Sequence, residues 1–144
     1  MIFIKKLSSD VPTPSFATPD SSGLDICAYI QEEQVLSPFK RVLIPTGFCM
    51  ELPEGYEAQI RPRSGLALKH GITVLNTPGT IDADYRAEVK IILINLGEED
   101  FLIMPLMRIA QMVIAKKTSV DIKVVSELND QTQRKFGGFG STGT

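Results

Sequence analysis

Two acidic residues separated by one position are the strongest candidates for proton chemistry in the chain. Asp82 and Asp84 stand in the run Asp82-Ala83-Asp84-Tyr85-Arg86, just after the tight turn that residues 76–79 predict. A carboxylate beside a loop can orient and deprotonate a water, which is worth roughly 10²–10⁴ in rate. Aspartates before a strand are also common turn formers. On this fragment alone, both interpretations stay open.

A second group of residues is suited to binding an anion. Arg63, Ser64 and Gly65 supply a guanidinium, a hydroxyl and a backbone without a side chain, where a short helix is predicted to start. Free backbone N–H groups and a guanidinium both favour phosphate. The alternative is an N-cap at Ser64 beside a surface arginine. Three residues do not decide between these alternatives.

The C-terminal tail offers a similar set, Arg134 with Gly140-Ser141-Thr142, whose backbone could close around phosphate oxygens. Its glycine density predicts that the tail is mobile in isolation. Ordinary disordered tails contain few aromatic residues, yet this tail contains Phe136 and Phe139. We therefore expect an arm that folds onto something, and docking onto its own domain stays open as the alternative.

The remaining reactive side chains favour no other chemistry. His70 is the single histidine and has no serine, cysteine or histidine partner near it in sequence, so a Ser-His-Asp mechanism is excluded and His70 is interpreted as structural or surface. Cys27 and Cys49 lack the close spacing of a zinc site and are predicted to be buried free thiols. Taken alone, the run Arg108-Ile109-Ala110-Gln111 predicts only an edge strand.

The elements that must position these groups are mostly strands. Apolar residues alternate with polar ones over residues 24–30, and again over residues 85–93, which is the clearest long strand. Turn residues separate the shorter runs, which favours an antiparallel sheet. One helical turn or two are predicted over residues 64–69. The shorter predicted strands cover residues 1–7, 42–44, 48–52, 56–60, 109–115 and 120–125.

Length and charge limit the class of protein. A chain of 144 residues with 43% apolar residues can form one domain with a real core, without disulfides or a structural metal. A net charge of −2 disfavours binding to duplex nucleic acid. The apolar run at the N-terminus is too short for the apolar region of a signal sequence. No later apolar run approaches the ~20 residues that span a bilayer. We expect a cytoplasmic protein without nucleic-acid or membrane partners.

In this order and at these separations, five fragments together resemble the motifs of the homotrimeric deoxyuridine triphosphate nucleotidohydrolase family, the dUTPases. Each motif alone is weak, but five of them in order span nearly the whole chain. They are Ser22-Gly23-Leu24-Asp25-Ile26, Pro62-Arg63-Ser64-Gly65-Leu66-Ala67, the run from Asn76 through Arg86, Arg108-Ile109-Ala110-Gln111, and the run from Arg134 through Gly143.

The resemblance implies an all-β fold, a distorted jelly roll (β-clip) with one short helix. Residues 1–125 would form the jelly-roll domain and residues 126–144 a flexible C-terminal arm. It also implies a homotrimer with active sites at subunit interfaces, each closed by the arm of another subunit. The implied reaction is hydrolysis of dUTP to dUMP and diphosphate, which limits uracil in DNA and supplies dUMP for thymidylate synthesis.

The resemblance also implies roles for single residues on the phosphate side of the substrate. Asp82 would hold the attacking water for in-line displacement at the α-phosphorus. The implied cofactor is Mg²⁺, to which Asp25 would bind through a water. The implied phosphate contacts are Arg63, Ser64, Gly65 and Gln111, with Arg134, Gly140, Ser141 and Thr142 from the arm.

Selection of the base and sugar is assigned, by resemblance, to a hairpin. The backbone around Asn76, Gly79, Thr80 and Ile81 would present the donors and acceptors that uracil needs. Tyr85 would pack against the deoxyribose and exclude a 2′-hydroxyl. Phe139 would stack on the uracil, and Lys90 would line the site.

Two rival functions are weighed against this one. The dCTP deaminases share the trimeric architecture, but the hairpin here matches the uracil version. A non-catalytic nucleotide-binding module could use the same fold, but it would not require Asp82, Asp25 and the arm together.

Overall fold

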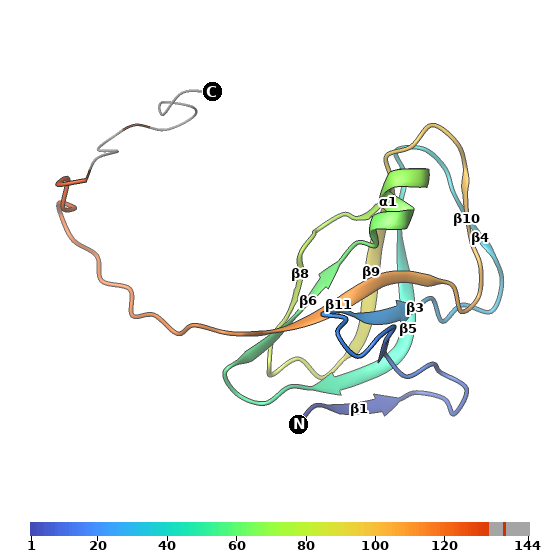
Figure 1. Ribbon diagram of the computed structural model, residues 1–144, viewed down its shortest axis with the longest axis horizontal. Coiled ribbons are helices and arrows are strands. Elements are labelled where there is room, and N and C mark those ends of the chain that lie inside the picture. The colour runs from blue at the N-terminus through green and yellow to red at the C-terminus, as the bar shows by residue number, and fades with distance from the viewer. Residues whose placement is uncertain (133–136, 138–144) are drawn as a thin grey trace.

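The computed structural model describes residues 1–132 and 137, and it is built almost entirely of strands (Figure 1). The strands are β1 (Phe3–Lys6), β2 (Ser15–Phe16), β3 (Leu24–Cys27), β4 (Gln34–Leu36), β5 (Arg41–Glu51), β6 (Tyr56–Arg61), β7 (Ile72–Val74), β8 (Gly79–Ile81), β9 (Glu88–Asn95), β10 (Phe101–Ile103) and β11 (Arg108–Lys116). In the described part of the chain the one helix is α1 (Ser64–His70), and no helix there is long and apolar enough to cross a membrane.

The strands form three sheets, and every pairing recorded between them is antiparallel. One large sheet has the order β1-β5-β9-β7 and the other has the order β2-β3-β11-β6-β8, while β10 and β4 pair separately. This confirms the predicted all-β class with one short helix and the antiparallel arrangement.

Both large sheets contribute to a single hydrophobic core. Ile26 of β3 and Ile44 and Leu93 of the other large sheet are each 0% exposed and belong to one cluster. Because successive side chains of a strand point to opposite faces, the apolar residues predicted to share one face now face the core. Ile26, Ala28 and Ile30 are buried, whereas Asp25, Cys27 and Tyr29, which alternate with them, are half-buried.

The structure corrects the prediction of two separate strands at residues 42–44 and 48–52. They form the single strand β5, which continues through Pro45-Thr46-Gly47. A register shift against β9 between Pro45 and Cys49 absorbs the irregular residues. Thr46 Oγ1 donates a hydrogen bond of 2.6 Å to the Val89 carbonyl across this gap. The turn-forming composition therefore marks a bulge and not a chain reversal.

Two other strand predictions were wrong, one at its start and one over its whole length. The strand β9 begins at Glu88 and not at Tyr85, because the Tyr85 N–H donates to the Asp82 carbonyl and closes a turn there. Residues 120–125 form no strand, and the chain beyond β11 extends away from the body (Figure 1). Val120, Ile122 and Val124 are 74%, 90% and 93% exposed, so their alternation has no partner strand within the described residues.

The N-cap of helix α1 lies one residue before Ser64, the residue at which the sequence predicted it. Arg63 is the N-cap, because its carbonyl accepts the first helical hydrogen bond, from Ala67 N at 3.0 Å. Its side chain makes no capping hydrogen bond. Ser64 is the first helical residue and is not the cap. The last helical residue is His70, and Gly71 caps the helix with a φ of 67°, in the left-handed region that glycine tolerates.

Candidate active site

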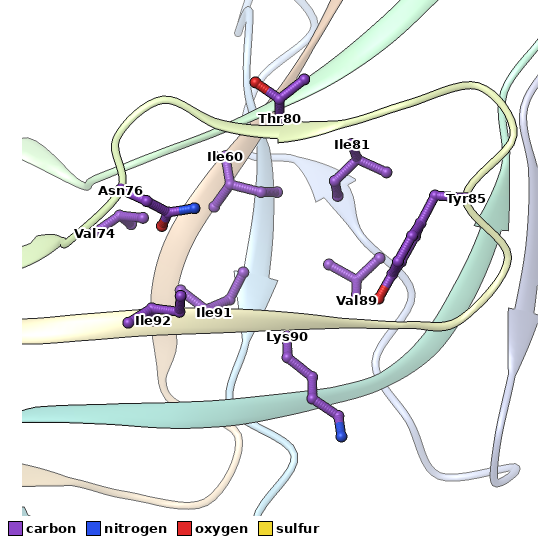
Figure 2. Close-up of a pocket in the computed structure, with 11 residues that line it drawn as sticks. Ile60, Val74, Asn76, Thr80, Ile81, Tyr85, Val89, Lys90, Ile91 and Ile92 are labelled. Atoms are coloured by element: carbon purple, nitrogen blue, oxygen red, sulfur yellow. The ribbon is translucent and has the colours of Figure 1, made fainter.

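A small pocket of about 180 Å³ gathers every residue predicted to contact the base and sugar, the arm excepted (Figure 2). Its walls come from β6, β7, β8 and β9 and from the loops on either side of β8. Apolar side chains dominate the lining, as expected for a pocket that encloses a flat ring. The lining residues are Ile60, Val74, Asn76, Gly79, Thr80, Ile81, Tyr85, Val89, Lys90, Ile91 and Ile92.

The segment that carries Asn76 and Gly79 is not a hairpin of paired strands, which corrects the prediction. The strand β7 pairs with β9 in one large sheet, and β8 pairs with β6 in the other. The connection between them therefore crosses from one sheet to the other and forms a wall of the pocket. A Cβ at Gly79 would lie 3.3 Å from both Ile60 Cβ and Asn76 Nδ2, so glycine permits this close approach.

Strand alternation decides which side chains enter this pocket. Ile60 and Ile81 point into it, whereas Thr80 and Lys90 point away from it (Figure 2). Lys90 Nζ lies 3.6 Å from the Glu88 carboxylate. Thr80 and Lys90 therefore contribute backbone to the pocket and not their side chains.

Tyr85 closes one end of the small pocket. Its hydroxyl donates a hydrogen bond of 2.9 Å to the Glu88 carbonyl, which fixes the ring beside Val89 (Figure 2). The ring is held although the residue is 40% exposed. A fixed ring at the pocket mouth can restrict the shape of a sugar bound there.

Asp82 follows β8 directly, in a turn held by its own backbone. Arg86 Nη1 donates hydrogen bonds to the carbonyls of Ala83 at 2.6 Å and Tyr85 at 3.0 Å, and Tyr85 N donates to the Asp82 carbonyl at 3.1 Å. Within residues 1–132 and 137, the exposed Asp82 carboxylate has no hydrogen bond or ion pair, and it lines neither pocket described here. Its position is fixed while its oxygens are free to bind a water.

A larger pocket of about 530 Å³ gathers all the residues predicted to contact phosphate or metal within the described chain. Arg63, Ser64 and Gly65 come from the start of α1, Asp25 from β3 and Gln111 from β11. Lys69 and His70 also line it, and sequence reasoning missed both. The signal that could have found Lys69 is its spacing of four residues after Gly65, which places both on one helix face.

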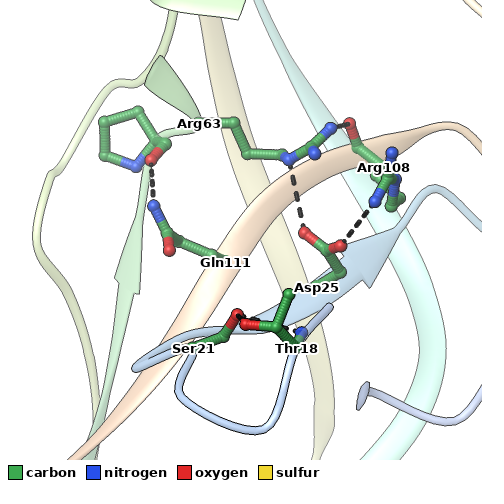
Figure 3. A network of polar contacts seen from close by, with 7 residues as sticks. Thr18, Ser21, Asp25, Arg63, Arg108 and Gln111 are labelled. Carbon is green, nitrogen blue, oxygen red and sulfur yellow. Dashed lines mark hydrogen bonds and ion pairs between the residues drawn. The ribbon is translucent and has the colours of Figure 1, made fainter. Parts of the chain in front are cut away.

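Asp25 lies between two guanidinium groups at the edge of this pocket (Figure 3). Its Oδ1 is 3.3 Å from Arg63 Nε and its Oδ2 is 2.8 Å from Arg108 Nη1. Arg63 Nη1 also donates a hydrogen bond of 3.2 Å to the Arg108 backbone carbonyl. Two positive charges and one negative charge leave this cluster cationic, which suits an anionic ligand.

Gln111 is held in place from two sides. Its Nε2 donates a hydrogen bond of 2.9 Å to the Pro62 carbonyl (Figure 3). A Cβ at Gly23 would lie 2.4 Å from Gln111 Oε1, so only glycine leaves room for this side chain as it stands. The loop before Gly23 is closed by a hydrogen bond of 3.1 Å from Thr18 N to Ser21 Oγ, which shapes the rim of the pocket.

The cysteines are free, as predicted, although both are half-buried and not buried. Burial, and after it the neighbouring Asp25 charge, raise the pKa of the Cys27 thiol. A raised pKa keeps this thiol neutral near pH 7, where it is a weak nucleophile.

The donor set suits a magnesium ion held mainly by a ligand's phosphates. Among the described residues, no three His, Cys, Asp or Glu side chains come together to hold a metal. Asp25 is the one carboxylate that lines the larger pocket, and each of its oxygens already faces a guanidinium. A carboxylate has about four lone-pair positions, so positions remain to bind a metal-bound water. The residues present fit Mg²⁺ bound in this indirect way.

The predicted arm residues Arg134, Phe139, Gly140, Ser141 and Thr142 lie outside the described residues. Their roles stay predictions.

Comparison with known proteins places the chain in a family. A family model described as dUTPase matches residues 9–143. A deoxyuridine 5′-triphosphate nucleotidohydrolase of Aquifex aeolicus is 61% identical over 143 residues, covering 98% of this chain and 95% of the relative. One of Hydrogenobaculum sp. is 56% identical over 142 residues, covering 99% and 97%.

Solved structures agree with these relatives. The dUTPase of Staphylococcus bacteriophage 80alpha with dUpNHpp aligns with a TM-score of 0.88 at 26% identity, covering 100% of this chain and 99% of that one. A dUTPase variant from phage phi11 of S. aureus, described with a structural Mg(II) ion, has the same fold, with a TM-score of 0.79 at 24% identity and coverage of 88% and 97%. With the fold, the motifs and close relatives in agreement, this chain belongs to the dUTPase family.

Proposed function

We propose that this chain hydrolyses dUTP to dUMP and diphosphate. The observation that carries the proposal is the division of the site into two pockets of different chemistry. The smaller one is narrow and mostly apolar, and the larger one is lined by Arg63, Lys69 and polar groups. A nucleoside triphosphate needs both kinds of surface. Membership of the dUTPase family supports uracil as the base.

The two pockets are lined by separate sets of residues, and a site shared between copies of the chain would join them. We propose a homotrimer in which the small pocket of one copy faces the phosphate pocket of another, and the arm of a further copy covers the nucleotide.

In the proposed mechanism, the Asp82 carboxylate accepts a hydrogen bond from a water and aims it at the α-phosphorus. The water oxygen bonds to that phosphorus, the bond to the bridging oxygen breaks, and diphosphate leaves. The water's proton passes to Asp82 and then to solvent. Arg63 and Gln111 bind phosphate oxygens and keep the reacting groups in line. Asp25 would hold Mg²⁺ through a water, and the bound ion would supply charge neutralisation on the phosphate oxygens.

Selectivity in this proposal comes from the small pocket. A close-fitting wall around Gly79 excludes a 5-methyl group, which is worth about 1–3 kcal/mol. Tyr85 excludes a 2′-hydroxyl, and Phe139 from the arm stacks on the base for roughly 1–3 kcal/mol. The activity would limit uracil in DNA and supply dUMP to thymidylate synthesis, in the cytoplasm.

Diphosphate release from dUTP, dTTP, dCTP and UTP with Mg²⁺ tests the proposed function. We expect dUTP to be hydrolysed much faster than the other three. Release of monophosphate from dUTP would overturn attack at the α-phosphorus. Ammonia release from dCTP would favour the deaminase instead, and tight binding of dUTP without turnover would favour the non-catalytic module.

Gly65 allows a test that separates stability from activity. A Cβ added there would meet no protein atom within 4 Å, and Gly65 lines the phosphate pocket. Gly65→Ala should therefore fold with unchanged stability or a gain of up to about 1 kcal/mol from helix propensity. The methyl group occupies space needed by the phosphates, so we expect KM for dUTP to rise about tenfold. Thermal unfolding and steady-state kinetics measure both effects. An unchanged KM would remove Gly65 from the phosphate site.

A further inference from the structure

We infer that Arg108 is a positioning residue that keeps the Arg63 guanidinium available to the triphosphate, acting through Asp25 and through its own backbone carbonyl. The inference rests on the proposed function for the identity of the ligand. It adds a residue that lies outside the phosphate pocket to the machinery of that pocket.

Arg108 is placed behind the pocket and not in it. The larger pocket is lined by Arg63 and Asp25 but not by Arg108. The Arg108 side chain is 53% exposed, against 28% for Arg63 and 16% for Asp25. The Asp25 carboxylate bridges the Arg108 and Arg63 guanidiniums (Figure 3). A group in this place acts on the ligand through its neighbours.

The contact at the backbone depends on an irregularity in β11. Its register against β3 shifts between Arg108 and Ala110, where Arg108 lies opposite Cys27 and Ala110 opposite Ile26. Such a bulge interrupts the ladder and redirects the residues at that point. The Arg108 carbonyl accepts the Arg63 Nη1 hydrogen bond of 3.2 Å. Replacing the Arg108 side chain leaves this backbone contact in place and isolates the ion pair with Asp25.

Arg63 keeps donors for the ligand under this arrangement. A guanidinium has five N–H donors. Arg63 gives one of them to the Arg108 carbonyl, and its Nε faces Asp25 Oδ1 at 3.3 Å in an ion pair. Three remain to face phosphate oxygens. The two contacts hold the fork in one orientation, which lowers the entropy cost of binding a ligand.

Asp25 would compete with the ligand if it were paired with Arg63 alone. Arg108 Nη1 takes the shorter contact, 2.8 Å, while Arg63 Nε takes 3.3 Å. Sharing the carboxylate charge in this way weakens its hold on Arg63 and its repulsion of an incoming triphosphate. Loss of the Arg108 side chain should therefore weaken triphosphate binding only while the Asp25 carboxylate is present.

A double-mutant cycle tests this dependence. Affinity for dUpNHpp is measured by calorimetry in EDTA, so that any metal held through Asp25 does not contribute. Tripolyphosphate is the second probe, because it reports on the phosphate pocket without the base. We expect Arg108→Gln to weaken both ligands about tenfold in the wild-type background and no more than about twofold in the Asp25→Asn background. Equal losses in the two backgrounds, or none in either, would overturn the inference.

Two further variants complete the experiment. Arg41 is exposed at the start of β5, so Arg41→Gln removes one positive charge elsewhere and should leave both affinities unchanged. A loss equal to that of Arg108→Gln would assign the effect to net charge and overturn the inference. Arg108→Lys keeps the charge without the planar fork and should weaken binding about threefold. If Arg108→Gln does not fold, this variant carries the cycle, with a threefold loss that disappears beside Asp25→Asn.

The two probes also separate this inference from the proposed function. If wild-type protein binds tripolyphosphate but not dUpNHpp, the proposed substrate is wrong, and the cycle with tripolyphosphate still decides the role of Arg108. If wild-type protein binds neither probe, the pocket does not bind phosphates and the inference fails.

Discussion

Asp82→Asn is expected to lower kcat for dUTP by about 10²–10⁴-fold and to leave nucleotide affinity nearly unchanged. The carboxylate is exposed and unpaired within the described part of the chain, so its removal breaks no contact there. The turn around it is held by backbone groups and by Arg86. Asparagine is as good a turn former as aspartate, so this substitution removes only the base.

The same substitution therefore decides between the two interpretations that the sequence left open for this run. Single-turnover kinetics separate the chemical step from binding, and dUpNHpp affinity checks that the site is intact. Asp84→Asn is the matched control, because Asp84 is also exposed, two residues further on in the same run. We expect it to keep kcat within about threefold. Retention of kcat by Asp82→Asn would show that Asp82 is only a turn former.

The predicted residues that line the two pockets, Lys90 excepted, belong to short motifs whose local structure is simple. The half-buried strand that carries Asp25 and the short helix that starts after Arg63 both follow from local patterns. How these elements combine does not. The Asn76–Gly79 segment has the turn residues of a hairpin, yet its two flanking strands pair in different sheets. Pairing partners are chosen by the packing of the whole domain.

Arg108 shows the same limit for side chains. Its ion pair with Asp25 joins residues 83 positions apart in sequence. No periodicity within β11 points to that contact, because it depends on β3 lying beside β11 and on the bulge between them. Charge networks of this kind follow from tertiary structure, and they were accordingly missing from the predicted site.

The strand predicted over residues 120–125 was wrong for a physical reason that bears on the arm. Alternation between apolar and polar residues describes a surface that fits a neighbouring strand, and a strand without a neighbour is not stable in water. Within the described residues, this segment extends from the body with its apolar side chains exposed (Figure 1). That geometry agrees with an arm that meets another copy of the chain.

Truncation after Gln133 is expected to leave a folded protein whose kcat/KM for dUTP is lower by about 10²-fold or more. Every residue of the hydrophobic cluster lies before β11 ends, so the core is untouched. The truncation removes Arg134, whose hydrogen bonds to phosphate are worth about 1.5–3 kcal/mol, and the stacking of Phe139, worth roughly 1–3 kcal/mol. Each 1.4 kcal/mol or so is tenfold in rate. Removal of Thr144 alone is the control and should change nothing.

Mixing two inactive variants then tests whether the arm serves its own copy or another. The truncated chain keeps Asp82 and lacks the arm, whereas full-length Asp82→Asn keeps the arm and lacks the base. If arms close sites on other copies, the two chains unfolded and refolded together should recover activity well above that of either alone, because some mixed sites combine an intact Asp82 with an intact arm. If the arm instead covers the small pocket of its own copy, beside its own Asp82, no site in the mixture has both groups, and activity should stay at the level of the separate variants. Fully active truncated protein would instead remove the arm from the mechanism.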